Sequence, residues 1–216
     1  MTTRRILTIL LLAAVLFGMP IGSWFYLRDG VRYRKEKLAQ LKDFGKWGAD
    51  LHLTNWRGEP FTTDSLRGNI TVVCAYDPAA TTADTAAVQL ERFQKAFGPD
   101  RRDIHIISLP FGAHADSATV AAFAAKHHAN PRVWHLLHGD ANHLQSLLDG
   151  LHIAQNTAAK DGLTPSYFAL IDTNLVVRQY YLGTNKTDVN KLIQIVSMIM
   201  RPSPTAKIKY RRREEK

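Results

Sequence analysis

Residues 51–76, LHLTNWRGEPFTTDSLRGNITVVCAY, contain the two patterns on which the fold prediction rests. The first is a hairpin, in which a strand over 50–54 is followed by a turn at 56–58 and by Phe61. The second is the short apolar, β-branched run at 69–76, which is typical of a strand buried in the middle of a sheet. The segment therefore predicts a sheet that contains both a hairpin and a buried central strand.

Strand and helix patterns alternate through the rest of the chain. The predicted strands lie at 103–109, 166–172 and 176–181, and the predicted helices at 85–97, 116–127, 141–151 and 187–200. Strands that are separated by helices and completed by a hairpin and a helix imply a mixed α/β sheet. We predict one domain over 44–200, because about 160 residues suffice for one hydrophobic core and are too few for two.

Near the N-terminus, residues 6–27 form a run of 22 residues without a charge. At about 1.5 Å per residue such a helix spans roughly 33 Å, which matches a hydrocarbon core of about 30 Å. We therefore predict a transmembrane anchor at 6–27 after a short tail at 1–5. The competing interpretation is a cleaved signal peptide, but its apolar region is usually only about 7–15 residues long and ends in small residues.

The formal net charge of +9 belongs to the two ends of the chain. Residues 1–40 and 201–216 each carry seven basic and two acidic side chains, whereas residues 41–200 carry 14 basic and 15 acidic ones. A nucleic-acid-binding face on the domain is therefore not expected. We predict a charged juxtamembrane helix or stalk at 28–43 and a basic, flexible tail at 201–216. Either segment could contact lipid, and the tail could equally contact an acidic partner or serve only solubility.

The order of these elements and several local strings resemble the Sco/SenC family, membrane-anchored thioredoxin-fold proteins of cytochrome oxidase maturation. The matching strings are LHLTNWRGEPFTTDSLRGN leading into TVVCAY, then DIHIISLP, VWHLLHGD and TPSYFALIDTNLVVRQYYLGT. The resemblance covers roughly residues 45–200, and the predicted N-terminal anchor fits it as well. It implies an α/β, thioredoxin-like fold with a central mixed sheet flanked by helices.

The copper site of that family is missing from this chain. Family members carry a CxxxC motif after the first central strand and a His before a later strand. These residues bind copper, and the cysteines can also form a disulfide. Counting from the neighbouring elements, the cysteine positions fall on Ala79 and Ala83 and the His position on or near Thr164, while Pro165 takes the place of the cis-proline of thioredoxin-like folds. Soft Cu(I) favours thiolate ligands, so the resemblance predicts a pseudo-active site.

Two residue types could still supply chemistry. Cys74, the one cysteine of the chain, lies inside a predicted strand, where a free cysteine is usually a buried small hydrophobe rather than a nucleophile. His135 and His138 are three residues apart, and His143 follows, so a shared helix face could hold Cu(II) or Zn(II). However, the string WHLLHGD resembles a strand and turn of the family, and residues three apart on a strand point to opposite faces. We expect histidines of a surface loop that bind no metal.

The sequence therefore predicts a single-pass membrane protein without cofactor or enzymatic activity. Its expected role is accessory or in assembly on a respiratory membrane complex, first of all a haem-copper (cytochrome c) oxidase, with lipid and subunits of that complex as partners and no nucleic acid. The resemblance places the domain on the periplasmic side of a bacterial cytoplasmic (inner) membrane, although the positive-inside rule alone favours the cytoplasm. The alternatives are a copper-handling protein that uses His135, His138 and His143, and a thiol-disulfide or peroxide oxidoreductase, which the missing cysteines disfavour.

Overall fold

The computed structural model describes residues 3–48, 50–98, 101–111, 116–153 and 167–200, with side chains from residue 15 onward. By its internal contacts the chain divides into two units, Met1–Lys42 and Asp43–Lys216. The first unit is dominated by helix α1, Thr3–Ala39, which contains Pro20.

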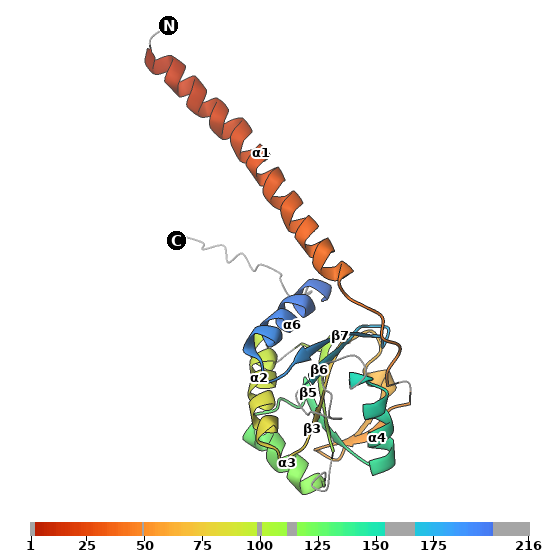
Figure 1. Ribbon diagram of the computed structural model, residues 1–216. Helices are drawn as coiled ribbons and strands as arrows, with labels where there is room; N and C mark the ends of the chain where they lie inside the picture. The colour runs from red at the N-terminus through yellow and green to blue at the C-terminus, as the bar shows by residue number, and fades with distance from the viewer. Residues whose placement is uncertain (1–2, 49, 99–100, 112–115, 154–166, 201–216) are drawn as a thin grey trace, which may run out of the picture. The chain divides into compact units, whose positions relative to one another are not determined.

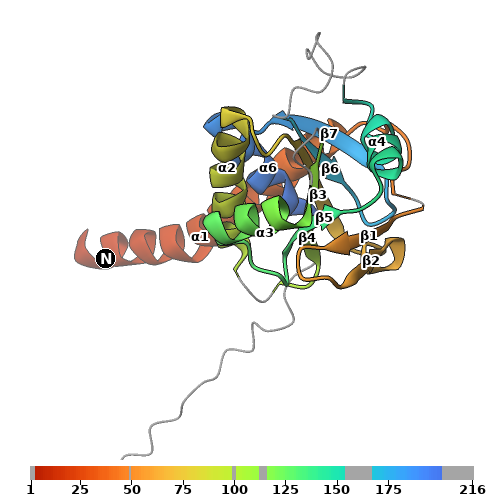
Figure 2. The same ribbon diagram turned by 90° about the horizontal axis from the view of Figure 1, so that it is seen from below.

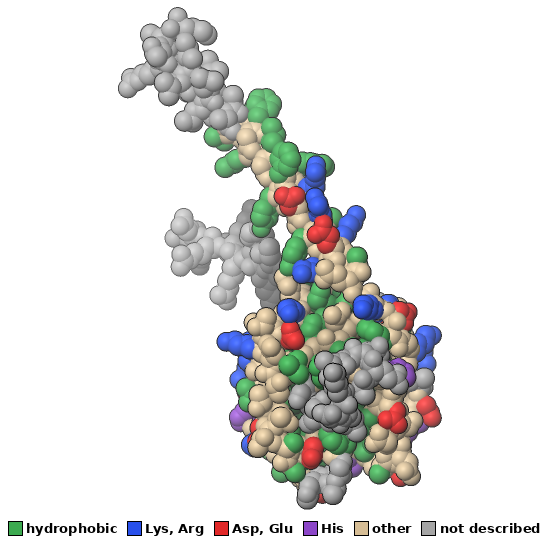
Figure 3. Space-filling model, viewed as in Figure 1, with side chains coloured by type: hydrophobic (Ala, Val, Ile, Leu, Met, Phe, Trp, Pro, Cys, Tyr) green, Lys and Arg blue, Asp and Glu red, His purple; other side chains and the backbone are tan. Residues whose placement is uncertain are grey.

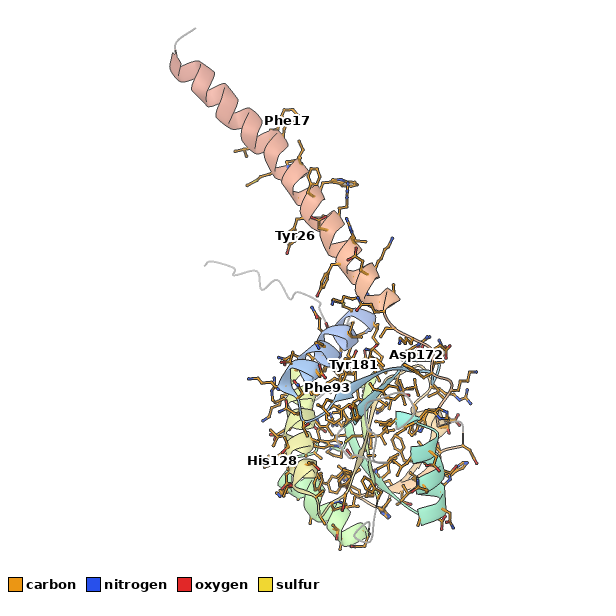
Figure 4. All side chains as sticks on the ribbon, in the orientation of Figure 1. Phe17, Tyr26, Phe93, His128, Asp172 and Tyr181 are labelled. Atoms are coloured by element: carbon orange, nitrogen blue, oxygen red, sulfur yellow. The ribbon has the colours of Figure 1, made fainter. Side chains whose placement is uncertain are left out.

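Helix α1 changes character along its described length. The large apolar side chains from Val15 to Leu27 are between 51% and 81% exposed, and Figure 4 shows those of Phe17 and Tyr26 projecting from the helix. Lys and Arg side chains gather further along the same helix (Figure 3). Among the residues that the structure describes, no helix is long and apolar enough to cross a membrane. The described part of α1 therefore does not bear out the anchor predicted at 6–27.

In the second unit, the described strands form one seven-stranded sheet in the order β2-β1-β5-β4-β3-β6-β7 (Figure 1). The predicted hairpin is confirmed as β1, His52–Asn55, paired antiparallel with β2, Pro60–Thr62. Its turn is held by the Asn55 side-chain oxygen, which accepts from the backbone N–H groups of Arg57 and Glu59 at 2.9 and 3.0 Å. Gly58 has a φ of +82°, a conformation that glycine adopts without steric cost.

The centre of the sheet is parallel, and the strands at both of its edges are antiparallel to their neighbours. β3, Ile70–Tyr76, lies between β4, Ile104–Pro110, and β6, Tyr167–Ile171. β5, Trp134–His138, pairs with the other side of β4, and β7, Val177–Leu182, pairs with the other side of β6. β3, β4 and β5 run parallel, whereas β6 is antiparallel to β3 and to β7. All seven residues of β3 are buried, which explains its continuous apolar run and confirms the predicted central strand.

Helices cover both faces of this sheet, so the predicted mixed α/β architecture is confirmed. α2, Thr81–Phe97, α3, Ser117–Lys126, and α6, Lys186–Ile199, lie on one face, and α4, Ala141–Asp149, lies on the other (Figures 1 and 2). Asp116, Asp140 and Asn185 cap α3, α4 and α6 through their side chains. α2 begins four residues before the predicted start, because its N-cap, Ala80, makes no side-chain hydrogen bond and provides no capping signal.

Candidate functional site

The site predicted from the resemblance falls on the loop and first helical turn that follow β3, residues 77–84, here called the β3–α2 corner. The Asp77 carboxylate accepts a hydrogen bond from the backbone N–H of Ala79 at 3.0 Å, which makes it a turn residue. Ala79 is exposed in the loop, and Ala83 is buried in the first turn of α2. The corner therefore holds methyl groups at both predicted cysteine positions. Thr164 and Pro165 lie outside the described residues.

Asp84 ties the corner to the end of α3. Its carboxylate accepts from the Lys126 ammonium at 2.7 and 2.8 Å and lies 2.9 Å from Nε2 of His127. The hydrogen bonds from Lys126, and then from His127, lower the pKa of Asp84 below its usual range. His127 is buried and its ring packs on Phe123 at a centroid distance of 4.5 Å. Asp84 thus joins the first turn of α2 to the end of α3.

Tyr76, the last residue of β3 before the corner, is not suited to proton transfer. Tyr76 is 2% exposed and stacks on Phe123 with ring centroids 4.6 Å apart. Burial raises the pKa of the Tyr76 phenol above its usual value, so the group stays protonated at neutral pH. Within the described residues its hydroxyl has no hydrogen-bond partner. The phenol therefore neither ionises nor connects to a base.

Cys74 has the structural role predicted for it. The residue lies inside β3, paired in register with Ser108 of β4 and Phe168 of β6. It is 1% exposed, and burial raises the pKa of its thiol to about 12. A thiol that is buried and protonated is neither a good nucleophile nor a good metal ligand.

The histidines of the alternative metal site do not converge. His135 and His138 lie three residues apart on β5, where alternate side chains point to opposite faces of the sheet. His143 lies in the first turn of α4, and its Nε2 accepts from the backbone N–H of His52 at 3.4 Å. In the described part of the chain, no three His, Cys, Asp or Glu side chains are grouped so that they could hold a metal. The expectation of a surface-loop histidine was wrong for His135, which is buried on a strand.

His135 pairs instead with a histidine that the sequence analysis did not consider. Nε2 of His135 lies 3.0 Å from Nδ1 of His105 on β4, and Nε2 of His105 lies 3.1 Å from the side-chain nitrogen of Asn69. These three residues are called the histidine cluster below. The ring of Phe61 on β2 packs against His135 at 4.6 Å. Desolvation lowers the pKa of His135 to about 3, with a smaller contribution from His105, and it also lowers the pKa of His105.

Only an indirect signal for this cluster is present in the sequence. His105 stands within the predicted buried strand 103–109, and a polar ring at such a position needs a hydrogen-bond partner. The partner, His135, is 30 residues away and becomes a neighbour only because β4 and β5 pair in parallel.

Comparisons with known proteins address the fold. No family model matches the chain, and no curated protein matches it in sequence. Solved structures do match it. The structure of a SCO1/SenC family lipoprotein from Bacillus anthracis is 21% identical, covers 73% of this chain and 97% of that one, and has a TM-score of 0.60. The chain has the fold of Sco/SenC proteins.

Two further structures agree with this result. BsSco, a member of the Sco family of cytochrome c oxidase assembly proteins, is 19% identical over 74% of this chain and 97% of its own, with a TM-score of 0.59. Copper-bound ScoI from Bradyrhizobium japonicum is 17% identical over 71% of this chain and 99% of its own, with a TM-score of 0.56. The thioredoxin-like fold predicted from the sequence is confirmed.

Proposed function

We propose that this chain is a non-catalytic accessory or assembly protein of a respiratory membrane complex, namely a haem-copper (cytochrome c) oxidase. It works without a cofactor, and neither copper transfer nor thiol chemistry takes place at its β3–α2 corner. Its partners are subunits of that complex and membrane lipid, and they do not include nucleic acid.

The observation that carries the proposal is a Sco/SenC-like scaffold in which residues 77–84 of the corner include neither cysteine nor histidine. Ala79 and Ala83 occupy the predicted cysteine positions, and the one thiol of the chain, Cys74, is buried within β3. The likeness to BsSco, whose family is that of cytochrome c oxidase assembly proteins, supports the choice of complex. A scaffold of this kind can still bind a protein partner through its surface, because docking requires neither a metal nor a thiol.

The proposed location is the periplasmic side of a bacterial cytoplasmic membrane, with a single-pass anchor at residues 6–27. Support for the anchor comes from the sequence, which has no charged residue between Arg5 and Arg28. The similar Bacillus anthracis protein is a lipoprotein, which is consistent with a membrane-bound relative. Exposed basic side chains follow the uncharged run on α1, where they could contact anionic headgroups: Arg28, Arg32, Arg34 and Lys35.

Affinity purification from native membranes tests the role. The full chain, tagged at its C-terminus, is purified in a mild detergent that keeps respiratory complexes intact, and the co-purified proteins are identified. We expect enrichment of oxidase subunits over an unrelated tagged membrane protein expressed at the same level. If no respiratory subunit is enriched while the complexes remain assembled, the proposed role is wrong.

Membrane fractionation tests the location separately. The full chain should stay in the membrane pellet after washes with high salt and alkaline carbonate, which remove peripheral proteins. A variant that lacks residues 6–27 is the matched control and should move to the supernatant. A full chain that washes off the membrane would exclude the anchor and leave the partner question to the purification experiment.

A further inference from the structure

The hydrogen-bond chemistry of the histidine cluster fixes where its protons lie. The side-chain nitrogen of Asn69 lies 3.1 Å from the backbone carbonyl oxygen of Ser65, which can only accept, so this nitrogen is the amide donor. The same nitrogen lies 3.1 Å from Nε2 of His105, which must therefore accept. A neutral imidazole that accepts at Nε2 carries its proton on Nδ1. Nδ1–H of His105 then donates to Nε2 of His135 at 3.0 Å.

These hydrogen bonds, which run from Asn69 through His105 to His135, cannot take up an additional proton without one of them breaking. A proton on Nε2 of His105 would face the amide donor of Asn69, and a proton on Nε2 of His135 would face Nδ1–H of His105. Either addition brings two donors together and breaks a hydrogen bond. Protonation of either ring is thus coupled to separation of the side chains.

The cluster joins elements that are distant in the sequence. Asn69 directly precedes β3, while His105 and His135 belong to β4 and β5. Phe61 brings β2 into the contact, because its ring lies 4.6 Å from that of His135 and 6.3 Å from that of His105. Among the described residues, the charged group that acts on His105 is Asp103, which pairs with Arg101 at 3.2 Å, and the titratable group that acts on His135 is His105 itself.

We propose that Asn69, His105 and His135 form an acid-labile latch, which holds the β1–β2 hairpin end of the sheet in place only while both imidazoles are neutral. Acidification would protonate the rings, separate them and loosen the packing of Phe61 on this end of the domain. This property goes beyond the accessory role proposed above and does not depend on it.

The direction in which stability changes with pH follows from the difference between the imidazole pKa values in the folded and the unfolded chain. The burial that lowers the pKa of both imidazoles in the folded chain is lost on unfolding, where an ordinary value of about 6.5 applies. The stability that depends on the neutral pair is therefore fully present above that pH and is lost as the pH falls below it. For one such imidazole, the unfolding equilibrium constant should rise roughly 20-fold between pH 7 and pH 5.

Histidine NMR on the full chain in mild detergent tests the latch directly. With ¹⁵N-labelled histidine, we expect His105 and His135 to show the neutral Nδ1–H form at pH 8 and to keep it at pH 5.5. Both should then lose their native signals together on further acidification. His52, whose side chain is 70% exposed and lies outside the cluster, provides the internal reference signal. An Nε2–H form of either ring, or one ring of the cluster that gains a proton while the native signals persist, would overturn the proposal.

Urea unfolding at pH 7 and pH 5 provides a second readout with matched variants. The His52→Gln variant should keep the rise in the unfolding constant, whereas His135→Leu should lose much of it. A rise in the unfolding constant that is lost in His52→Gln but kept in His135→Leu would exclude the latch. If His135→Leu does not fold, the NMR result on the unsubstituted chain decides.

Discussion

The two ends of strand β3 differ in how they use polar side chains. At the end that follows Tyr76, the β3–α2 corner places Ala79 and Ala83 where the resemblance puts copper-binding cysteines. At the other end, Asn69 begins a chain of side-chain hydrogen bonds through two buried or half-buried imidazoles. The difference shows that imidazoles pack inside the sheet at one end of β3, whereas the positions at which the resemblance puts metal ligands carry methyl groups.

Restoring the family pattern at the corner should produce the largest change. We expect the triple variant Ala79→Cys, Ala83→Cys, Thr164→His to bind a single copper ion per chain, because thiolate and imidazole ligands suit copper and methyl groups do not. A copper titration against a competing chelator, with thiolate charge-transfer absorption as the signal, measures this gain.

The matched control for this variant carries serines in place of the two cysteines and keeps Thr164→His. It should show no thiolate band, and neither should the unsubstituted chain, whose Cys74 is buried. Equal copper binding by the unsubstituted chain would show that the corner, or another group, still holds the metal.

Breaking the histidine cluster should have the largest effect on stability. We expect His105→Leu to lower the free energy of unfolding by about 3 kcal/mol, because it leaves the buried His135 acceptor without its donor. His52→Leu, at an exposed position, should change it by less than about 0.5 kcal/mol. Urea unfolding at pH 7 measures both values.

A double-mutant cycle shows whether this loss comes from the pairing itself. Replacing His105 and His135 together with leucine removes both partners, so the double variant should lose less than the sum of the two single losses by about 1 kcal/mol or more. Additive losses would mean that the two rings contribute independently, against the pairing seen at 3.0 Å.

The two ends of β3 also show which features of the fold could be predicted from the sequence and which could not. Apolar runs predicted β3, β4 and β6, because burial of a strand leaves a continuous apolar pattern in the sequence. β7, which is only partly buried and carries Arg178 and Gln179, was predicted as the strand across a short turn from β6. β5 was indicated only by the resemblance of its string to a family strand. The start of α2 was placed too late, since an alanine N-cap carries no signal. Absence of the second cysteine needed no structure at all, because it follows from the count of one.

The partners of the histidines could not be predicted in this way. The i, i+3 spacing of His135 and His138 is a local pattern, whereas the contact with His105 depends on the parallel register of β4 with β5. In the same way, nothing local distinguishes Thr63 from Thr71. Only tertiary packing decides which hydroxyl finds a partner.

Substitutions at Thr63 and Thr71 should have the next smaller effect on the free energy of unfolding. The Thr63 hydroxyl accepts from the N–H of Leu51 at 2.9 Å and donates to the carbonyl of Gly48 at 2.7 Å, so Thr63→Val should cost about 2 kcal/mol. Thr71 pairs in register with His105, and among the described residues its buried hydroxyl has no hydrogen-bond partner. Thr71→Val should therefore leave stability unchanged or raise it by up to about 1 kcal/mol in urea unfolding. A loss at Thr71 as large as that at Thr63 would reveal a hydrogen bond to this hydroxyl.

The smallest expected effect is at the corner, where Asp84→Asn tests whether its ion pair is needed. Side chains at Asp84 and Lys126 are 48% and 60% exposed, so water and salt screen their attraction, and the loss should not exceed about 1 kcal/mol. Since the folded pKa of Asp84 is lowered, this contribution is present above about pH 4 and disappears as the pH falls further. Added salt should shrink the difference between the two proteins in urea unfolding.

Asp64→Asn is the control for that substitution, because Asp64 forms a more exposed ion pair with Arg67. This variant should lower the free energy of unfolding even less than Asp84→Asn does. A loss of several kcal/mol at Asp84, independent of salt, would mean that the corner depends on one buried polar network, as the opposite end of β3 does. A small, salt-sensitive loss would instead support a corner whose conformation needs neither a metal nor a strong ion pair. In that case the alanines are tolerated because the surrounding sheet and helices already fix the backbone, which leaves this surface available for a protein partner.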